Sequence, residues 1–449
     1  MKRYSVVMLL VIVAMLFVAC APAEPQVVEK TVIQTVVVEK EVAVEKKVVE
    51  TVIVEVEKEI PRVTNSLGVV LPEDAAPLDK QVWPIAYFEG KNFDYNKNIY
   101  EWNSMGAECF QALVLPDSDW NFYPGDADSW ETSADGLTWT FHLNPDRKWS
   151  DGSQVTAWDY EFTFKRLMDP ATANNYAWFY YTFKNAAPVN RGEMAVDELG
   201  VKALDDLTLT ITTEAPVPYM LMIIAFPTSW PVNKAMVEKH GDDWSKDIST
   251  VLTNGPYVPV EWNHGSNLVS GLNPNYTGPK KPMVEKVVTT FIQQGAPTMS
   301  MYQAGELYNA GGSQQADYIM AINDNNLRKD VDVYSTFTTR YVWFNSLVPP
   351  FDNLKVRQAI SLAIDRAAIT EQVTMGMNIP TLTMIPPGIP CSSYGDADIQ
   401  QYGEYNPEKA QALMAEAGYP GGEGFPEFEM WTKQGEAIPE LEAIQSMLK

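Results

Sequence analysis

The sequence has few of the residues that metal sites and histidine-dependent catalytic sites require. Among 449 residues there are three cysteines and three histidines, and the histidines (His142, His240 and His264) are scattered. The chain also lacks the G-x-S-x-G, H-E-x-x-H and P-loop patterns that mark common hydrolase, metalloprotease and nucleotide sites. We therefore expect no cofactor, no metal and no histidine-based triad.

Positive charge is scarce as well. Acidic residues number 58 against 33 basic ones, which gives a formal net charge of −25. Such a balance argues against a protein that follows a nucleic-acid backbone or an anionic bilayer surface. High solubility is the simplest meaning of the charge, and a preference for cationic ligands is a second one. With 46% hydrophobic residues, the chain is long enough for two or three core-forming units.

The N-terminus has the features of a targeting segment. Two basic residues precede an apolar run over residues 6–18, which has the length of a secretory signal core and is short for a spanning helix. The end of this run, FVAC at residues 17–20, resembles a bacterial lipobox, which implies cleavage before Cys20 and a lipid on that cysteine. Phe17 stands where leucine is usual, so a plain signal peptide or an uncleaved anchor stays open.

An exported chain would keep two cysteines, Cys109 and Cys391. Cysteines in an oxidising compartment can form a disulfide. These two lie far apart in the sequence and their distance in space cannot be inferred, so the sequence leaves this disulfide open.

Residues 21–64 are of low complexity. From Val27 to Pro61 they are built mainly from valine, glutamate and lysine, without glycine or aromatic residues. The apolar residues recur at irregular intervals, so neither a heptad repeat nor a strand alternation is sustained, and no packed core can form. We interpret the segment as a stalk between a membrane anchor and a folded body. A coiled-coil oligomerisation segment is the alternative.

Residues 130–168 predict a compact supersecondary unit. Asp135-Gly136 between two alternating runs is a hairpin signal, and the alternation places every second side chain on one face. After a further turn, Thr156 and Asp159 form a variant of the capping box at the start of a helix that ends before Pro170. The aromatic residues of this unit are expected in its core.

Segments along the chain resemble, in order, the signature segments of one known family. They are SWETSADGLTWTFHL, KWSDGSQVTAWDYEFTFKRL, LGVKALDDLTLTITTEAPVPY and, most strongly, PFDNLKVRQAISLAIDR over residues 350–366. On these segments the chain resembles the family-5 extracellular solute-binding proteins of ABC importers, most closely the oligopeptide-binding branch, over most of residues 80–449. The resemblance implies an α/β fold, in which two lobes form a clamp of the periplasmic-binding-protein type II kind beside a small accessory domain.

The resemblance also implies a domain organisation. The expected parts are a lipoprotein signal peptide (1–20), the stalk (21–64), the first part of lobe I (65–112), the accessory domain (113–230), the continuation of lobe I (231–337) and lobe II (338–449). Members of the family continue for roughly a hundred residues beyond the helix expected at the end of this chain, so we expect the C-terminal part of the fold to be missing.

Four further elements are expected outside these segments. Residues 81–87 fit the first strand of lobe I, and residues 105–113 resemble its first helix. Residues 338–345 resemble the strand that carries the chain between the lobes, where a clamp absorbs its closing rotation. Residues 427–432 alternate as a strand.

The candidate ligand-binding residues are Tyr100, Glu101 and Trp102. In the oligopeptide binders that the chain resembles, a short strand before the first helix pairs with the main chain of the peptide, and backbone pairing of this kind accepts any peptide sequence. A buried edge segment is the alternative. Arg357 and Arg366 could bind a ligand carboxylate. We expect instead that both pair with nearby acidic residues on the helix surface.

The sequence as a whole predicts an extracytoplasmic, lipid-anchored substrate-binding component of an ABC importer, on the outer face of the bacterial cytoplasmic membrane or in the periplasm. Its partners would be an oligopeptide and the permease and ATPase subunits of the importer, with no nucleic acid. An oligosaccharide is the alternative ligand, since thirteen tryptophans offer flat apolar faces. An enzyme is the alternative from another class, with the acid pairs Asp117/Asp119 and Asp205/Asp206 as candidates, although acids in turns are usually only solvated.

Overall fold

The computed structural model of the chain describes residues 31–39, 49–57, 63–293, 297–310, 315–332, 337–389, 392–432 and 438–449. Residues 1–78 and residues 79–449 form two separate compact units. Within the described ranges, no helix is both long enough and apolar enough to cross a membrane. The signal peptide with Cys20, and also Cys391, lie outside the described residues.

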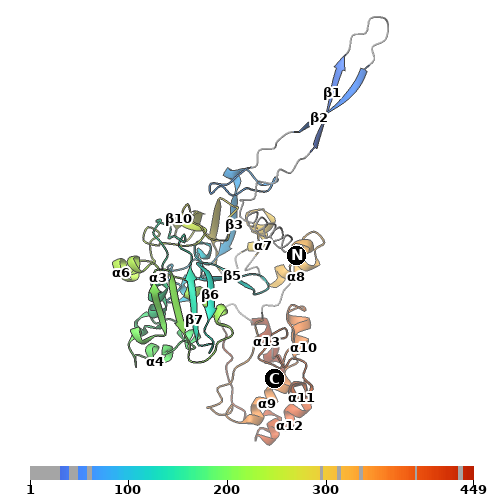
Figure 1. Cartoon of the computed structure of the whole chain (residues 1–449). Coiled ribbons are helices and arrows are strands. Elements are labelled where there is room, and N and C mark those ends of the chain that lie inside the picture. The colour runs from blue at the N-terminus through green and yellow to red at the C-terminus, as the bar shows by residue number, and fades with distance from the viewer. Residues whose placement is uncertain are drawn as a thin grey trace, which may run out of the picture. The chain divides into compact units, whose positions relative to one another are not determined.

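The first unit contains an antiparallel hairpin of β1 (Thr31–Glu39) and β2 (Val49–Glu57), drawn in blue in Figure 1. Its register pairs Thr31 with Glu57 and Glu39 with Val49. The expectation that residues 21–64 sustain no strand alternation is therefore wrong for these two stretches, and so is the coiled-coil alternative. Valine and threonine favour strands, and strand pairing tolerates an irregular order of apolar and charged residues that a heptad seam does not.

The second unit contains a sheet, here called the β3 sheet, with the strand order β10-β11-β12-β3. Its strands are β3 (Val82–Tyr87), β10 (Tyr257–Asn263), β11 (Asn267–Leu272) and β12 (Lys286–Phe291). β3 and β12 pair in parallel, and the other pairs are antiparallel. β3 confirms the strand expected at residues 81–87. The sheet packs on a core that includes Trp102, Trp244 and Leu268, all at most 1% exposed.

A second sheet, the β7 sheet, has the order β6-β7-β9-β8, and α3 packs against it (Figure 1). Its elements are β6 (Ala127–Thr132), β7 (Thr138–Leu143), β8 (Val201–Asp205), β9 (Thr208–Thr212) and α3 (Ala157–Met168). The predicted hairpin turns at Gly136, whose φ is +74°, and the capping box of Thr156 and Asp159 is present. Phe141 and Trp149 are fully buried, so the predicted unit is confirmed. Its aromatic core is confirmed except at Trp158, which is 45% exposed.

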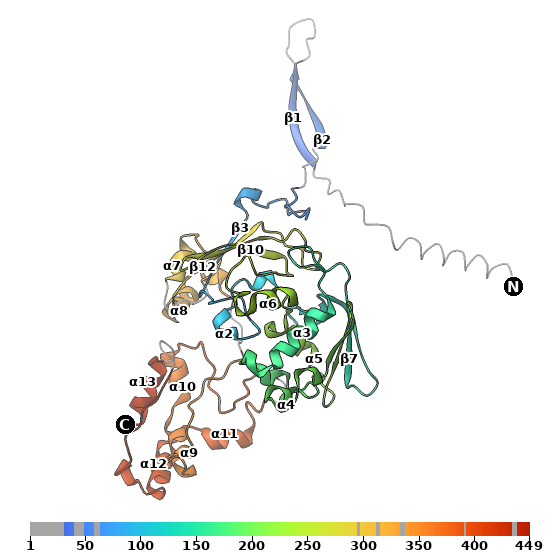
Figure 2. The ribbon, with the colours of Figure 1, turned by 90° about the vertical axis from the view of Figure 1, so that its left-hand side faces the viewer.

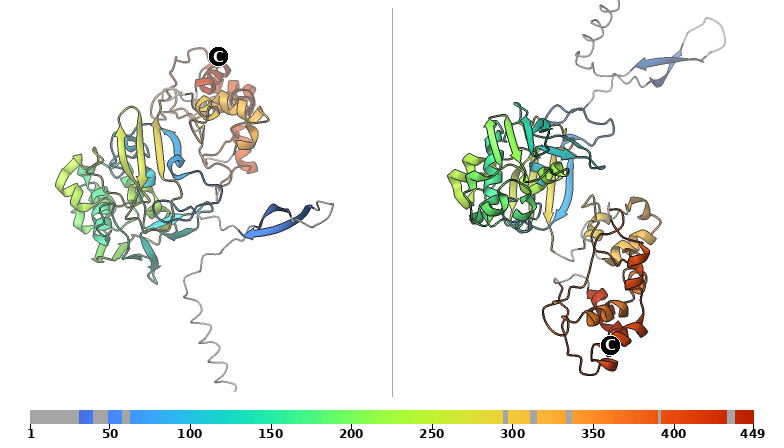
Figure 3. Two further views of the ribbon diagram at one scale, coloured as in Figure 1. Left: turned by 90° about the horizontal axis from the view of Figure 1, so that it is seen from above. Right: turned by 60° about the horizontal axis from the view of Figure 1, so that its bottom comes forward.

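Shorter elements complete the part of this unit before residue 337. They are α2 (Ile99–Trp102), β4 (Val114–Pro116), β5 (Phe122–Pro124), α4 (Ala186–Asn190), α5 (Met220–Ala225), α6 (Lys234–His240), α7 (Thr298–Gln303) and α8 (Gln315–Asn323). β4 and β5 pair antiparallel. The views in Figure 2 and Figure 3 show the helices and the two sheets of this part from other sides.

The helix expected over residues 105–113 does not form. Only a 3-10 turn at Ala107–Cys109 is helical, and the chain is extended from Phe110 onward. A tertiary contact explains the difference, because the Asn254 side chain accepts from the main-chain N–H of Gln111 at 3.1 Å and donates to its carbonyl at 2.9 Å. Both main-chain groups of Gln111 are thereby withdrawn from a helical ladder.

The described part of residues 337–449 consists of helices and irregular chain, without a strand. The helices are α9 (Leu354–Ala363), α10 (Arg366–Ala368), α11 (Ala397–Gly403), α12 (Pro407–Glu416) and α13 (Ile438–Met447), in orange to red in Figure 2. The strands expected at residues 338–345 and 427–432 are therefore not formed. Among the described segments, neither stretch takes part in the ladder of hydrogen bonds that makes a sheet.

Helix boundaries in this part follow their caps closely. Asp365 accepts from the N–H of Ala368 at 2.9 Å, and Asn406 caps α12, whose first residue is Pro407. α9 is capped by Asn353.

Candidate functional site

The three predicted ligand-binding residues lie in α2, which is a helical turn and not the expected strand. Asn98 caps the turn by accepting from the N–H of Tyr100 at 3.0 Å, and Asn103 ends it in the left-handed region with a φ of +53°. These two asparagines predict a capped helical turn. The strand was expected only from the resemblance to the oligopeptide-binding branch.

The three side chains have different environments. Tyr100 is 67% exposed, whereas Trp102 is 1% exposed and donates its indole N–H to the Met105 carbonyl at 2.7 Å. Glu101 is paired with Lys91 at 2.8 Å. Trp102 belongs to the core under the β3 sheet, which agrees with the alternative that this stretch is a buried segment. A ligand role for Tyr100 stays a prediction.

Tyr100 is part of an exposed group of aromatic rings, which we call the aromatic platform and define as Tyr100, Tyr176 and Trp178. The hydroxyls of Tyr100 and Tyr176 are 3.0 Å apart, and the rings of Tyr176 and Trp178 stack at 6.0 Å with an interplanar angle of 26°. Phe226 supports the Tyr176 ring at 5.3 Å. The hydrogen bond to Tyr100 and burial raise the pKa of the Tyr176 hydroxyl, so this phenol stays neutral and able to donate at neutral pH.

A shallow hollow lies at the carboxyl ends of the parallel strands β3 and β12. Its lining residues are Phe88, Glu89, Gly265, Phe291, Ile292 and Gln293, around a volume of about 500 Å³. Open α/β sheets bind ligands beyond the carboxyl ends of their parallel strands. The hollow adjoins α2, because Asn103 donates to the Glu89 carbonyl at 3.1 Å and the Lys91 N–H donates to the Glu101 carbonyl at 2.7 Å.

Glu89 fixes one wall of this hollow. Its carboxylate accepts from the Trp262 indole at 3.0 Å and from the Gly265 N–H at 2.9 Å, and it pairs with His264 at 2.9 Å. Burial raises the pKa of Glu89, but the hydrogen bonds from His264, Gly265 and Trp262 outweigh burial and hold this pKa below its ordinary value. The carboxylate is therefore charged and holds the turn between β10 and β11 against the loop after β3.

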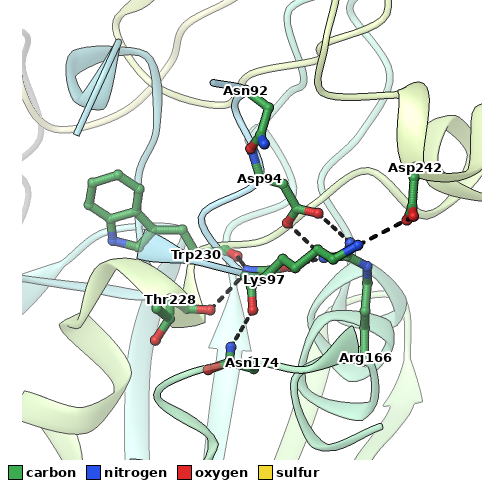
Figure 4. Close-up of polar contacts among 9 residues, drawn as sticks. Asn92, Asp94, Lys97, Arg166, Asn174, Thr228, Trp230 and Asp242 are labelled. Atoms are coloured by element: carbon green, nitrogen blue, oxygen red, sulfur yellow. Dashed lines mark hydrogen bonds and ion pairs between the residues drawn. The ribbon is translucent and has the colours of Figure 1, made fainter. Parts of the chain in front are cut away.

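A polar junction links residues 94–97, just before α2, to Arg166 of α3 and to Asn174 and Asp242, and Figure 4 shows its side chains. Asp94 accepts from the Arg166 guanidinium, with Oδ1 2.9 Å from Nη1, and both side chains are nearly buried. Lys97 pairs with Asp242 at 3.3 Å, and Asn174 donates to the Asn96 carbonyl. This junction holds residues 94–98 beside residues 174–176, which brings Tyr100 to Tyr176.

Asp126 forms a second, fully buried polar centre between the two sheets. Its carboxylate accepts from Gln111 at 2.7 Å, from the Tyr160 hydroxyl at 2.8 Å and from Asn254 at 2.6 Å. Burial raises the pKa of Asp126 to about 6, although these three hydrogen bonds lower it. Gly255 is required next to this centre, because a Cβ there would lie 2.5 Å from the main chain of Cys109.

Comparisons with known proteins decide the family. The profile for bacterial extracellular solute-binding proteins, family 5 Middle, matches residues 121–449. The chain belongs to this family.

Relatives of this solute-binding protein agree with the profile. It is 32% identical over 321 residues to the periplasmic oligopeptide-binding protein OppA of Escherichia coli (strain K12), which covers 71% of this chain and 58% of that protein. It resembles the solved structure of an oligopeptide-binding protein, OppAIV, from Borrelia burgdorferi with a TM-score of 0.68 and 29% identity, over 82% of this chain and 73% of that one.

A further similar structure is that of Haemophilus influenzae OppA in complex with RPPGFSPFR, with a TM-score of 0.64 and 31% identity, over 76% of this chain and 68% of that one. The predicted family and its α/β fold class are thus confirmed. The chain spans 58% of the length of the Escherichia coli relative, and the predicted domain boundaries stay predictions.

The candidate acid pairs of the solute-binding protein serve its turns. Asp117 accepts from the N–H groups of Asp119 and Asn121, both at 2.8 Å, and Asp205 accepts from the Leu207 N–H at 2.9 Å. Asp206 accepts from the Trp158 indole at 2.9 Å. No group of three or more metal-binding side chains occurs among the residues that the structure describes.

The two arginines of the strongest family segment do not pair with acids as expected. Arg357 donates to the carbonyls of Phe351 and Asp352 at 2.6 and 3.1 Å, and Arg366 donates to the Ser361 carbonyl at 3.0 Å. These arginines close the turns around α9, so they act within the scaffold. Cys109 is buried with a free thiol that lies 3.6 Å from the Ser270 hydroxyl.

Sequence reasoning missed Tyr176 and Trp178. The dense run of aromatic residues at 176–183 (YAWFYYTF) was available as a signal. Tyr180 and Phe183 of this run are fully buried, whereas Trp178 is 61% exposed, and the sequence does not separate them. Only the fold shows which of these rings lie beside Tyr100.

Proposed function

We propose that this chain is the extracytoplasmic substrate-binding component of an ABC importer and that it binds oligopeptides. Its permease and ATPase subunits would then be its partners, and no chemistry on the ligand is needed. The observation that carries the proposal is the aromatic platform that Tyr100 of α2 forms with Tyr176 and Trp178, in a chain of the family-5 solute-binding proteins.

The chemistry of this surface suits a peptide. Aromatic rings offer apolar area for side chains at a low cost in conformational entropy, and the Tyr100 and Tyr176 hydroxyls can bond to peptide groups. Relatives named as oligopeptide-binding proteins, one of them solved with a bound nonapeptide, support the choice. The two lobes would close on the ligand, and the closed form would meet the permease. The peptide populates the closed form only to the extent that it binds that form more tightly than the open one.

Calorimetric titration tests the proposal. We expect a mixed pool of tripeptides to pentapeptides to bind and a series of cello-oligosaccharides not to bind. Tyr100→Ala should weaken peptide binding about fivefold to tenfold, because it removes one ring and one hydroxyl from the platform. Leu204→Ala on β8 is the control, since Leu204 is similarly exposed, at 63%, and lies outside the platform. Binding of the sugars alone would overturn the peptide assignment.

The membrane attachment is a separate part of the proposal. The lipobox-like end of the apolar N-terminal run supports a lipid on Cys20, and this places the chain on the outer face of the cytoplasmic membrane or in the periplasm. Labelling of cells with radioactive palmitate should mark the wild-type chain and not Cys20→Ser. Equal labelling of both proteins would contradict the anchor.

A further inference from the structure

The exposed indole of Trp178 is a feature that packing within the chain does not explain. One side of the ring stacks on Tyr176, and its edge meets Phe179 at 5.8 Å with an interplanar angle of 84°. Even so, 61% of the residue is exposed. The supporting rings are themselves held by Phe226, which lies 5.3 Å from Tyr176 and 4.9 Å from Phe179. Trp178 is thus a rigidly backed aromatic surface that faces solvent.

Three ion pairs lie in α2 and in the junction that holds it. Lys91 pairs with Glu101 at 2.8 Å, Lys97 pairs with Asp242 at 3.3 Å, and Asp94 pairs with Arg166. Asn175, next to Tyr176 in the chain, donates to Asn98 at 3.2 Å. These charges already have partners, so a charged ligand group would have to compete with an existing pair for its counter-charge.

We propose that the platform is a specificity subsite that selects a neutral aromatic side chain in the peptide, and that Trp178 is the residue that selects it. The inference rests on the proposed peptide-binding function and goes beyond it by naming the side chain. Aromatic pairs gain from offset or edge contacts in addition to the area that they bury. A lysine over the same rings would gain a cation–π contact, but such a contact is weaker at an exposed site than at a desolvated one.

Tripeptides that differ in one residue test the proposal whichever position of the peptide meets the platform. Trp-Ala-Ala, Ala-Trp-Ala and Ala-Ala-Trp are compared with Ala-Ala-Ala, and the best position is then repeated with lysine and glutamate. For wild type we expect the best tryptophan peptide to bind at least about fivefold more tightly than Ala-Ala-Ala and more tightly than the lysine and glutamate peptides.

Variants then assign the preference to Trp178. Trp178→Ala should reduce the preference for tryptophan over alanine to less than about twofold, whatever its effect on the binding of Ala-Ala-Ala, and Trp178→Phe should keep most of the preference. Trp120→Ala is the matched control, because Trp120 is also 61% exposed and lies in the turn between β4 and β5. An unchanged thermal midpoint shows that each variant is folded.

The outcomes separate this inference from the proposed function. If no peptide binds to wild type, the proposed function fails. If the peptides bind without a preference for tryptophan, or if Trp178→Ala keeps that preference, peptide binding stands and the subsite is wrong. If lysine gains as much as tryptophan and both gains vanish in Trp178→Ala, the platform accepts cations as well as neutral rings, and its selectivity for neutral aromatic side chains is wrong.

Discussion

Residues 113–230 and residues 338–449 are of similar length, yet they differ in how they bury apolar side chains. In the first region the β7 sheet and α3 enclose a core in which Phe141, Trp149 and Phe183 are fully buried. In the described part of the second region, helices pack on one another, while Trp343, Leu347 and Trp431 are 82%, 89% and 87% exposed.

The difference shows which kinds of local structure need a distant partner. A helix satisfies its own main-chain hydrogen bonds, so α9 and α12 form from their caps and apolar stripes. A strand needs a neighbour. In the β7 sheet, β6 pairs with β7 and β8 with β9 close by in the sequence, and β7 pairs with the more distant β9. The stretches expected as strands at 338–345 and 427–432 join no sheet in the described part of the chain.

The largest test of this comparison replaces one tryptophan in each region. Trp149→Ala should lower the free energy of unfolding by about 3–5 kcal/mol, because it leaves a cavity in a closed core. Trp343→Ala should change it by no more than about 0.5 kcal/mol, since its side chain is mostly solvated. Denaturation in urea followed by circular dichroism measures both. A loss of similar size in the two variants would mean that Trp343 is buried in solution.

The second test compares the ion pair that Arg166 of the first region makes with Asp94, which lies before that region, with an ion pair inside the second region. Asp94→Asn should cost about 3–5 kcal/mol, because it leaves the nearly buried Arg166 without its counter-charge. Glu416→Gln breaks the exposed pair of Lys355 and Glu416, 2.9 Å apart, between α9 and α12, and should cost about 0–1 kcal/mol. The same denaturation series measures both variants, and a smaller cost for Asp94→Asn than for Glu416→Gln would refute the comparison.

The third test uses pH on the polar centre of the first region. The folded pKa of Asp126, about 6, lies above its ordinary value of 3.8, so its contribution to stability is present below pH 4 and is lost as the pH rises through 6. Asp126→Asn does not titrate. The stability of wild type minus that of the variant should therefore fall by about 3 kcal/mol between pH 4 and pH 7.5.

A difference that stays constant over this pH range would show that Asp126 keeps its charge in the folded protein at all these values. Asn has one acceptor and one donor group, while Gln111, Tyr160 and Asn254 all donate to Asp126. The variant is therefore expected to be less stable than wild type at pH 4.

The smallest effect is expected from the first unit. Deletion of residues 27–60 should leave the thermal midpoint of residues 79–449 within about 2 °C, because residues 1–78 form a compact unit of their own. Differential scanning calorimetry of both chains measures it. A drop of about ten degrees would show that the segment packs on the folded body and would end its interpretation as a stalk.

Two elements expected from the resemblance to the family, the strand at Tyr100 and the helix at residues 105–113, do not form. The strand expected at Tyr100 is a helical turn because Asn98 and Asn103 cap it, and both asparagines stand in the sequence. The first helix fails for a reason outside its own residues, because the Asn254 side chain binds the main chain of Gln111. The first error could be avoided with the sequence alone, and the second could not.

The family, the hairpin at Gly136 and the capping box of Thr156 could be predicted from the sequence alone, since each depends on residues close together in the chain. Only the tertiary structure decided which aromatic rings are exposed and which residues meet Tyr100. Tyr176 lies 76 residues from Tyr100 in the chain, and the junction of Asp94 with Arg166 sets their contact. Contacts of this kind depend on how separate elements pack, and no periodicity or spacing within one element records that.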